Sequence, residues 1–471
     1  MPKGARMPIR RLFLLLVCLL NLGTLLLFAT ALAAVEPNNS LAEPELSLSG
    51  PMLGAVEMTE AKIWVQTSRE AQVRLVYWPK SHPLEPRFGR IRQSQEDAEF
   101  ALTIVLDRLM PGTPYRYRIE VDGKLFGPPA GYAFKTQPDW LKRTDPPPLR
   151  IALGSCVYLN DPVADPPAPP LGGDYRIFEA IAASQPDLML WLGDNIYLRP
   201  RDYFSPAGIS DRYRQLRTLP ELQNLWHSSA HYAIWDDHDY GDNDADRSYR
   251  LRQASFELFQ HYWANPAYGL PEAPGVFGRF GWSDVEFFLT DNRSYRAPFR
   301  MADPHRDFFG PRQLQWLKDS LSASQASFKF VVVGNQVLNT RTPSENFYSY
   351  QSEYQDFLGW LAQAKIPGVV LLSGDRHHSE MLRLDRPGTY PLYEWTVSPL
   401  TSKAYPPFPQ EQVLPERMPG SLLVERNYGL IDLSGPAGER VLKLSLHDAT
   451  GKPKWSHTLH QQDLQPPKLK N

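Results

Sequence analysis

Two patterns of apolar and polar residues divide the chain. From about residue 46 to residue 136, apolar and polar positions alternate in short runs. Four of these runs occupy residues 62–67, 72–77, 101–106 and 115–121. Turn residues such as Pro-Gly-Thr-Pro at 111–114 separate them. Alternation bounded by turn residues is typical of half-buried antiparallel strands, so this part of the chain is predicted to form a small β-sandwich.

A different pattern begins after the proline-rich linker at residues 145–148. Longer apolar runs there alternate with amphipathic stretches, which predicts an α/β domain. Three helices are expected: one after Asp174, one from Pro311, and one over residues 352–365, where Ser352 and Gln355 fit a capping box. Proline-rich stretches at 161–173 and 404–420 are predicted to be surface loops, the first of them covering a site that includes Cys156.

Residues that carry chemistry follow six of the longer apolar runs. The runs end in Gly-Ser-Cys (154–156), Gly-Asp-Asn-Ile-Tyr (193–197), Asp-Asp-His-Asp (236–239), Asp-Asn-Arg (291–293), Gly-Asn-Gln (334–336) and Gly-Asp-Arg-His-His (374–378). A single aspartate after a strand is explained by helix capping. In doubly wound sheets, however, ligands bind at the carboxyl ends of the strands, so the six endings together predict one site.

Composition and charge narrow the class of partner. The chain has 471 residues, of which 42% are hydrophobic and 22% charged, so it is an ordinary globular protein and not a disordered or coiled-coil one. Its net charge is −2, and because residues 1–33 carry four positive charges and no negative one, the remainder carries −6. An acidic body has no diffuse attraction for nucleic acid or an anionic membrane, so the expected partner is a small molecule.

The N-terminal segment has the order of an export signal. Basic residues precede the apolar run at 12–28, and Ala31-Leu32-Ala33 provides a small-residue cleavage motif. Residues 1–33 are therefore interpreted as a signal peptide, and the mature protein as periplasmic or secreted. An uncleaved membrane anchor is the alternative, because the apolar run is long enough to span a bilayer. Arg10-Arg11 also fits a twin-arginine signal, so the general and twin-arginine routes both stay open.

The cysteine content supports a site at residue 156. With Cys18 in the signal segment, only Cys156 remains in the mature chain, so no disulfide can form within it. Cys156 is then either a metal ligand or a small buried apolar residue.

The mixture of side chains at the strand ends favours two kinds of cation. Thiolate and imidazole beside carboxylates indicate a transition metal with a harder companion, and not a structural zinc site. Tyr197 suits Fe(III), which accepts phenolate, although a core tyrosine is the alternative. Asn243 offers an amide oxygen to a hard cation.

An EF-hand starting at Asp242 is excluded because Arg247 stands where the loop needs glycine. A nucleophilic serine lacks its G-x-S-x-G motif.

The motifs G-S-C, G-D-x-x-Y, W-D-D-H-D, D-x-R-x-Y-R, G-N-Q and S-G-D-R-H-x-S-E occur in this order. With the small β-domain before them, they resemble the PhoD-like alkaline phosphatase D family of metallophosphoesterases, over residues 46–433. The G-D-x-x-Y element also resembles the iron-binding element of purple acid phosphatases. Residues 109–117 resemble part of a fibronectin type III module, which implies a fold and no function.

The resemblance implies an architecture. It implies a four-layer α/β sandwich preceded by a fibronectin III-like β-sandwich. The expected boundaries are residues 1–33 for the signal peptide, 46–137 for the β-sandwich, 149–433 for the phosphatase domain and 434–471 for a C-terminal tail.

It also implies a metal site. Cys156, Asp194 and Tyr197 would hold Fe(III), with Asp194 bridging to Ca²⁺ or another divalent cation. Three further residues would complete the metal sites, namely Asp237, Asp375 and His377. His238 matches the residue that assists the leaving group.

The chemistry of such a site predicts a mechanism. Metal-bound hydroxide would attack phosphorus while His238 protonates the departing alkoxide. Arg293 is the candidate for binding a phosphate oxygen, and a salt bridge to Asp291 or another carboxylate is its alternative. His378 is either a residue behind the ligands or an exposed one.

The predicted function is therefore an exported phosphatase for small-molecule phosphomonoesters or phosphodiesters, without nucleic acid as a dedicated partner. A stable membrane partner is expected only if the N-terminal segment stays uncleaved. Two alternatives remain, a phospholipid-headgroup phosphodiesterase and a non-catalytic binding protein on the same fold.

Overall fold

A computed structural model describes residues 46–167, 169–344 and 346–467. The predicted signal peptide at 1–33, with Cys18, lies outside the described residues. In the part of the chain that is described, no helix is long and apolar enough to cross a membrane. Residues 48–471 form one compact unit by their internal contacts, so the predicted β-sandwich and α/β domains are not separated there.

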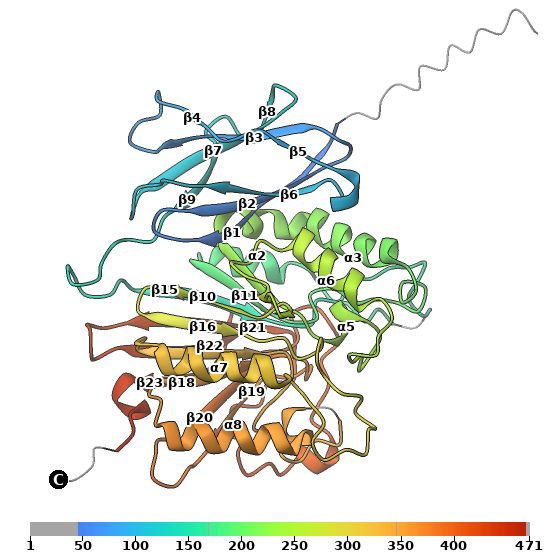
Figure 1. Ribbon diagram of the computed structural model, residues 1–471, viewed down its shortest axis with the longest axis vertical. Coiled ribbons are helices and arrows are strands. Elements are labelled where there is room, and N and C mark those ends of the chain that lie inside the picture. The colour runs from blue at the N-terminus through green and yellow to red at the C-terminus, as the bar shows by residue number, and fades with distance from the viewer. Residues whose placement is uncertain (1–45, 168, 345, 468–471) are drawn as a thin grey trace, which may run out of the picture. The chain divides into compact units, whose positions relative to one another are not determined.

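The N-terminal part consists of two antiparallel sheets, as the alternating pattern predicts (Figure 1). One sheet contains β1 (Leu48–Val56), β2 (Ala61–Thr67) and β6 (Ala101–Leu106). The other contains β3 (Gln72–Pro79), β4 (Arg87–Phe88), β5 (Arg92–Gln93), β7 (Pro114–Val121), β8 (Lys124–Phe126) and β9 (Tyr132–Lys135). In the core of this sandwich, the Phe134 ring stacks on Tyr115 and packs at an angle against Tyr117.

The first large sheet combines parallel and antiparallel strands. Its order is β12 (Ala230–Ile234), β11 (Leu188–Leu192), β10 (Leu149–Gly154), β21 (Asn427–Ser434), β22 (Val441–Asp448) and β23 (Pro453–His460). Strands β10, β11 and β12 are parallel, and the last three are antiparallel. Buried side chains join this sheet to α2 (Ile177–Ala183), α3 (Pro206–Thr218), α4 (Gln223–Ser228) and α6 (Arg252–Tyr262). Because β10, β11 and β12 run in one direction, their carboxyl ends share one edge.

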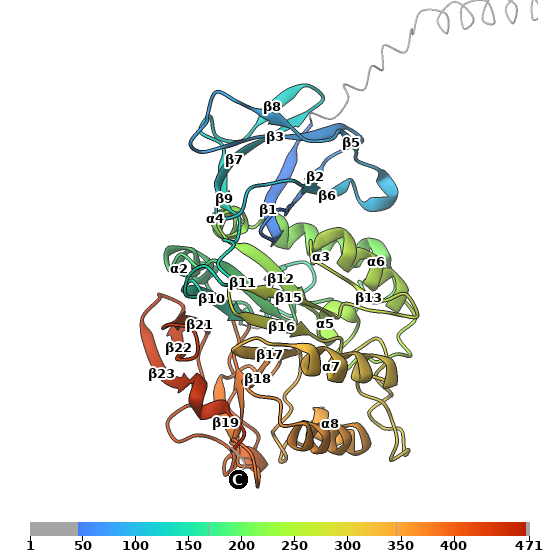
Figure 2. The same ribbon diagram turned by 60° about the vertical axis from the view of Figure 1, so that its left-hand side comes forward.

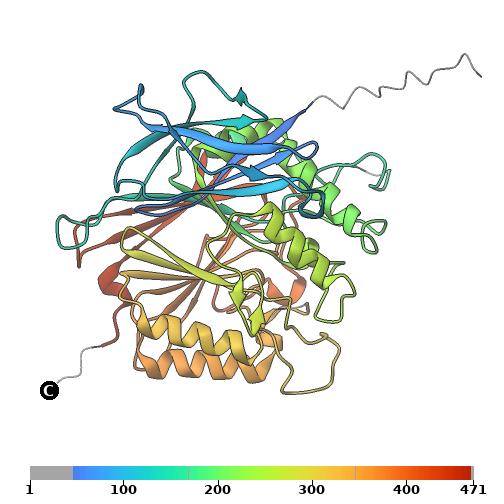
Figure 3. The same cartoon turned by 45° about the horizontal axis from the view of Figure 1, so that its top comes forward.

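The second large sheet is mostly parallel. Its order is β15 (Gly278–Trp282), β16 (Val285–Leu289), β17 (Phe328–Val333), β18 (Val369–Ser373), β20 (Leu392–Thr396) and β19 (Glu380–Leu384). One face packs on α7 (Pro311–Ala323) and α8 (Gln351–Ala364), which lie side by side (Figure 3). The predicted inward residues Leu314, Leu317 and Leu321 of α7 are all buried there.

The two large sheets pack face to face, so the α/β part has four layers (Figures 1 and 2). Tyr232 of β12 stacks on Phe280 of β15 with ring centroids 3.6 Å apart. A Cβ atom on Gly429 of β21 would lie 2.7 Å from Trp395 of β20. The predicted four-layer α/β sandwich with an N-terminal β-sandwich is confirmed.

The N-terminal sandwich rests on the helices of the first sheet (Figure 2). The Trp64 indole donates to the carbonyl of His261 in α6 at 2.7 Å, and Val56 N–H donates to the Tyr232 hydroxyl at 3.1 Å. These buried hydrogen bonds fix the sandwich against the outer layer.

Two local predictions are wrong. The described part of the predicted tail, residues 434–467, contains β22 and β23, which extend the first sheet and bury Leu442, Leu444 and Leu446. Ser352 does not cap the third helix, since α8 begins one residue earlier, at Gln351, with no side-chain cap. The cap lies upstream, where the Asn346 side chain accepts a hydrogen bond from Ser349 N–H at 3.0 Å before the short 3-10 helix Phe347–Ser349.

Candidate metal centre

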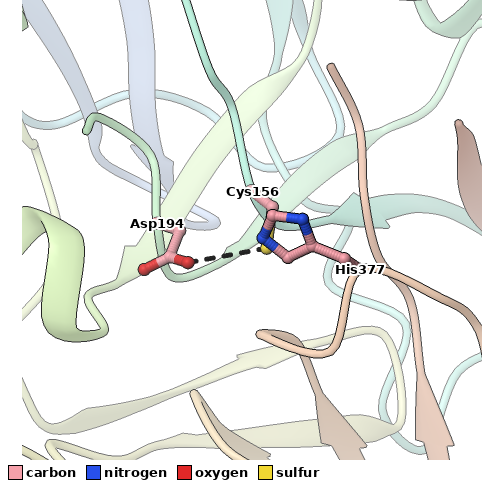
Figure 4. Close-up of side chains that lie close together, drawn as sticks. All are labelled: Cys156, Asp194 and His377. Atoms are coloured by element: carbon pink, nitrogen blue, oxygen red, sulfur yellow. Dashed lines mark hydrogen bonds between the residues drawn. The ribbon is translucent and has the colours of Figure 1, made fainter. Parts of the chain in front are cut away.

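Side chains from four strand ends meet between the two large sheets. Cys156 follows β10, Asp194 follows β11, Asp237 follows β12 and His377 follows β18. Ligand atoms of Cys156, Asp194 and His377 lie within 4.8 Å of one another, as do those of Asp194, Asp237 and His238. Figure 4 shows the first group, with the Cys156 thiol and the Asp194 carboxylate directed toward each other. Asp194 belongs to both groups, so the arrangement offers two adjoining donor sets that share one carboxylate.

Sharp turns after the strands aim these side chains. Cys156, Asp194, Asp375 and His377 have positive φ angles of 63°, 52°, 68° and 55°. Residues other than glycine adopt this left-handed region rarely, and such conformations gather at functional sites. Gly193 precedes Asp194 with φ of 96°, and a Cβ there would lie 2.8 Å from the Cβ of Asp236. The glycine therefore allows the β11 turn to approach the β12 turn.

Four donor atoms crowd together in the first group. The Asp194 carboxylate oxygen Oδ2 lies 3.5 Å from Cys156 Sγ and 3.1 Å from the Tyr197 hydroxyl. The same hydroxyl lies 3.1 Å from Nε2 of His377. His377 Nδ1 lies 2.6 Å from the carbonyl oxygen of Lys403, and because a carbonyl only accepts, Nδ1 carries the proton. The lone pair of Nε2 is then directed at the cluster, which is the arrangement of a metal-binding imidazole.

The second group is fixed by backbone hydrogen bonds. Asp237 Oδ1 accepts from His238 N–H at 3.0 Å, and Oδ2 accepts from Asp244 N–H at 2.8 Å. The His238 ring stacks on Tyr197 with centroids 4.1 Å apart. His238 thereby lies beside both groups, on the short helix α5 (Asp237–Tyr240).

Electrostatics at the centre favour a cation. Burial, and next the negative charges of Asp237 and Cys156, raise the pKa of Asp194 well above its ordinary value. Burial also raises the pKa of the Cys156 thiol to about 11, although hydrogen bonds from Ser155 and Ser398 oppose this shift. Without a cation, crowded acidic groups resist ionisation. They release their protons when a metal ion binds.

Asp237 differs from Asp194 because positive charges face it. Burial opposes the ionisation of Asp237, but the charges of His238 and Arg293 outweigh burial and lower its pKa. Burial lowers the pKa of His377, which keeps its imidazole neutral and available as a ligand.

Asp194 and His377 of the first group, and all three residues of the second, line one cavity of about 720 Å³. Its wall includes Asp194, Asp237, His238, Asn243, Asp244, Asp375 and His377. Asp375 is thus placed in the same cavity as the other predicted ligands, although outside the two tight groups. A second hollow of about 800 Å³, on the first sheet beside α2, contains neither group of donors.

Arg293 lies behind the centre and not on the cavity wall. Its side chain is fully buried, and its Nε donates to Asp236 Oδ1 at 2.6 Å. Asn335 Nδ2 donates to the other oxygen of Asp236 at 3.1 Å. The structure thus places Arg293 in the salt bridge that was the alternative to phosphate binding. The sequence alone predicts no role for Asp236 or Asn335, although both residues belong to the strand-end motifs.

The buried position of His378 agrees with one of its two alternatives, and the two proline-rich stretches lie differently at the site. His378 is 1% exposed, and its Nε2 lies 3.6 Å from Oε1 of Glu380, so it is not a surface residue. Residues 405–409, from the second proline-rich stretch, line the cavity, whereas the described residues of 161–173 are not among those that line it. The first stretch instead packs Leu171 against the cluster of Cys156, Tyr158 and Tyr197.

Comparison with known proteins agrees with this fold. A solved structure named PhoD matches with a TM-score of 0.70 and 17% identity, covering 87% of this chain and 88% of that one. The purple acid phosphatase PPD1 from yellow lupin (Lupinus luteus) seeds matches with a TM-score of 0.63 and 10% identity, covering 90% of this chain and 77% of that one. At these identities the similarity concerns the fold.

A family profile and the two donor groups together identify a metal-dependent phosphatase. The family profile described as PhoD-like phosphatase matches residues 152–428, which is more than half of the chain. The chain belongs to the PhoD-like phosphatase family. Residues 44–139 match a domain of unknown function, DUF7800. A search of curated proteins gives no match.

Proposed function

We propose that this protein is an exported phosphatase that hydrolyses small-molecule phosphomonoesters or phosphodiesters with the aid of two metal ions. The observation that carries the proposal is the pair of donor groups sharing Asp194 on the wall of one cavity. A shared carboxylate suits two adjacent cations, because its two oxygens can each face one of them.

The donor chemistry fits a hard trivalent ion beside a divalent one. Cys156 and Tyr197 contact one oxygen of Asp194, and His377 contacts the Tyr197 hydroxyl. Thiolate, phenolate and imidazole together suit Fe(III). The neighbouring set around Asp237 is rich in oxygen donors, which suits Ca²⁺ or a similar cation. Asn243 and Asp375 would add oxygen donors from the same cavity.

Bound metal ions in such a pair lower the pKa of water and offset the charge that develops at phosphorus. The remaining tasks belong to side chains of this chain. Asp194 holds the two sites together, and Asp237 stays ionised because His238 and Arg293 face it. Asp236, held by Arg293 and Asn335, keeps the β12 turn in place.

His238 is the group we assign to protonation of the leaving group. It lines the cavity beside Asp194 and Asp237. Its peptide N–H donates to Asp237, which holds the main chain, and its ring stacks on Tyr197, which orients the ring without substrate. General-acid help of this kind contributes about 10²- to 10⁴-fold to a rate.

Export rests on the sequence of residues 1–33. Four cationic residues, an apolar run and Ala31-Leu32-Ala33 support a cleaved signal. A phosphatase released in this way would act on phosphate esters outside the cytoplasm, and the small cavity supports a small-molecule partner.

The test is metal analysis paired with kinetics. Elemental mass spectrometry of the purified protein should find about one iron and a divalent metal per chain. Hydrolysis of p-nitrophenyl phosphate and bis(p-nitrophenyl) phosphate should stop when a chelator removes the metals, and their relative rates give the preferred ester.

Two variants separate metal binding from proton transfer. Cys156→Ala should lose iron and activity while its circular dichroism stays unchanged. His238→Ala should keep both metals and lose turnover. An active, iron-replete Cys156→Ala protein would disprove the assignment. Metal-free wild-type protein without turnover would favour a non-catalytic binding protein.

A further inference from the structure

One wall of the cavity is apolar and differs from the rest of the site. Residues 405–409, Tyr-Pro-Pro-Phe-Pro, line the same cavity as the acidic and histidine side chains. Tyr405 and Phe408 are 43% and 44% exposed, so both residues keep surface that the described chain does not cover. We call residues 405–409 the aromatic wall. A hydrophobic surface beside a polar centre is typical of sites that bind ligands with an apolar part and a polar part.

The aromatic wall begins directly at a proposed metal ligand. The ring centroid of Tyr405 lies 5.4 Å from that of His377, and Tyr405 N–H donates to the His377 carbonyl at 2.9 Å. A group attached to a phosphate held at His377 would therefore meet Tyr405 next.

Polar contacts hold the aromatic wall in place. Phe408 N–H donates to Glu411 Oε2 at 2.8 Å, and Glu411 forms a salt bridge of 2.7 Å with Arg376. The Arg376 guanidinium also lies 5.4 Å from the centre of the Phe408 ring. Three prolines stiffen the segment further. A preformed wall binds a ligand with little ordering cost.

The size of the cavity leaves room for more than phosphate. Ligand cavities of about 300–1,000 Å³ hold drug-sized molecules, and this one is about 720 Å³. We propose, on the basis of the function proposed above, that the preferred substrates are phosphate esters with a flat aromatic group, which stacks on Tyr405 and Phe408 while the phosphate occupies the metal centre.

Binding of two phosphonates tests the proposal without turnover. Phenylphosphonate and methylphosphonate both carry the phosphate-like group, and only the first carries a ring. Isothermal titration calorimetry of the metal-loaded protein, at an alkaline pH where both are dianions, should give tighter binding of phenylphosphonate. Aromatic contacts of this kind change affinity by roughly 2- to 10-fold.

Three variants locate the effect. Tyr405→Ala and Phe408→Ala should each reduce the phenyl-to-methyl affinity ratio toward one, and because Tyr405 contacts His377 the ratio is the quantity compared. Phe88→Ala removes an aromatic ring of similar exposure from β4, which is outside the cavity, and should keep the wild-type ratio. Equal wild-type affinities for the two phosphonates, or a ratio that both wall variants preserve, would overturn the proposal.

Kinetics separate this proposal from the proposed function. Phenyl p-nitrophenyl phosphate and methyl p-nitrophenyl phosphate have the same charge and leaving group, so a difference in kcat/KM reports the group that stays on phosphorus. The wild-type protein should prefer the phenyl ester, and Phe408→Ala should lose that preference. Cleavage of both esters at equal kcat/KM would contradict the aromatic wall alone. Failure to cleave either diester and also p-nitrophenyl phosphate would contradict the phosphatase function, and calorimetry would still decide the binding preference.

Discussion

Asp236 and Asp237 are neighbours in sequence with different tasks. Asp236 is fully buried and is bound by Arg293 and Asn335 behind the centre. Asp237 lines the cavity beside His238. The motif Asp-Asp-His-Asp contains both, but the residue type alone does not tell which carboxylate faces the metals. Their roles differ because, in the turn after β12, the Asp236 side chain points into the core and the Asp237 side chain points into the cavity.

Arg293→Gln tests the supporting role at the scale of one residue. The change leaves the buried Asp236 charge without its strongest partner, so the free energy of unfolding should fall by about 3–5 kcal/mol. Denaturant unfolding monitored by circular dichroism measures it. Arg150→Gln is the matched control, because its ion pair with Asp432 is 44% exposed on the arginine side and such pairs contribute about 0–1 kcal/mol. Equal losses in both variants would refute the role of Arg293.

At the scale of elements, parallel strands and their turns build the site. β10, β11 and β12 end at one edge of the first sheet, and β18 of the second sheet brings His377 to the same place. Each of these strands is buried and nearly all apolar. The first polar residues of each segment therefore lie in the turn that follows the strand, and that turn borders the cavity. This is why the strand-end motifs contain side chains that lie close together at the cavity.

The start of α8 provides a prediction about one element. Asn346→Ala removes a side chain that caps the short helix before α8, and the free energy of unfolding should fall by about 0.5–2 kcal/mol. Ser352→Ala, at the position the sequence suggested for a cap, should change it by less than about 0.5 kcal/mol, since α8 has no side-chain cap. Thermal and chemical unfolding of the two variants compares them directly. A larger loss for Ser352→Ala would restore the original capping prediction.

At the scale of the molecule, two large sheets and two helical layers enclose the centre. His231 lies in the outer core, where Nδ1 accepts from the Trp191 indole at 2.9 Å and Nε2 lies 2.9 Å from the Leu225 carbonyl. Only the neutral ring with a proton on Nε2 can make both bonds. Burial lowers its pKa from 6.5 to about 3.

His231 therefore makes the folded molecule sensitive to acid. The unfolded chain binds a proton at His231 below pH of about 6.5 and the folded chain does not, so stability falls as the pH drops from there toward about 3. The loss between pH 7.5 and 5 should be about 2 kcal/mol. Denaturant unfolding at both pH values should show that His231→Gln lacks this loss, whereas His82→Gln, at an exposed histidine, keeps it. An unchanged pH profile in His231→Gln would show that other groups cause the acid sensitivity.

The C-terminal strands give a second prediction for the whole molecule. Deleting residues 435–471 removes β22 and β23, so β21 loses its neighbour and the apolar side of the sheet is exposed. The shortened chain should be insoluble or rapidly digested by protease. Thr458→Ala, an exposed position on β23, should stay soluble and resistant. A soluble, protease-resistant chain ending at residue 434 would show that the segment is the dispensable tail that the sequence suggested.

Residue periodicity and strand-end motifs were enough to predict much of this protein. The strands of the sandwich, the helix with Leu314, Leu317 and Leu321 inward, and the gathering of Cys156 with Asp194 all follow from local patterns. These features are local because alternation and turn residues fix a strand and its end, and parallel strands then bring their ends to one edge.

Only the tertiary structure decided how the remaining residues are used. Arg293 forms a salt bridge with the buried carboxylate of Asp236, and residues 405–409 line the cavity. Residues 441–460 contain two strands of the first sheet. Each outcome depends on a partner far away in sequence, such as Asp236, His377 or β21. The sequence by itself determined which chemistry is present and where strands end, whereas packing between the layers decided which side chains reach the cavity.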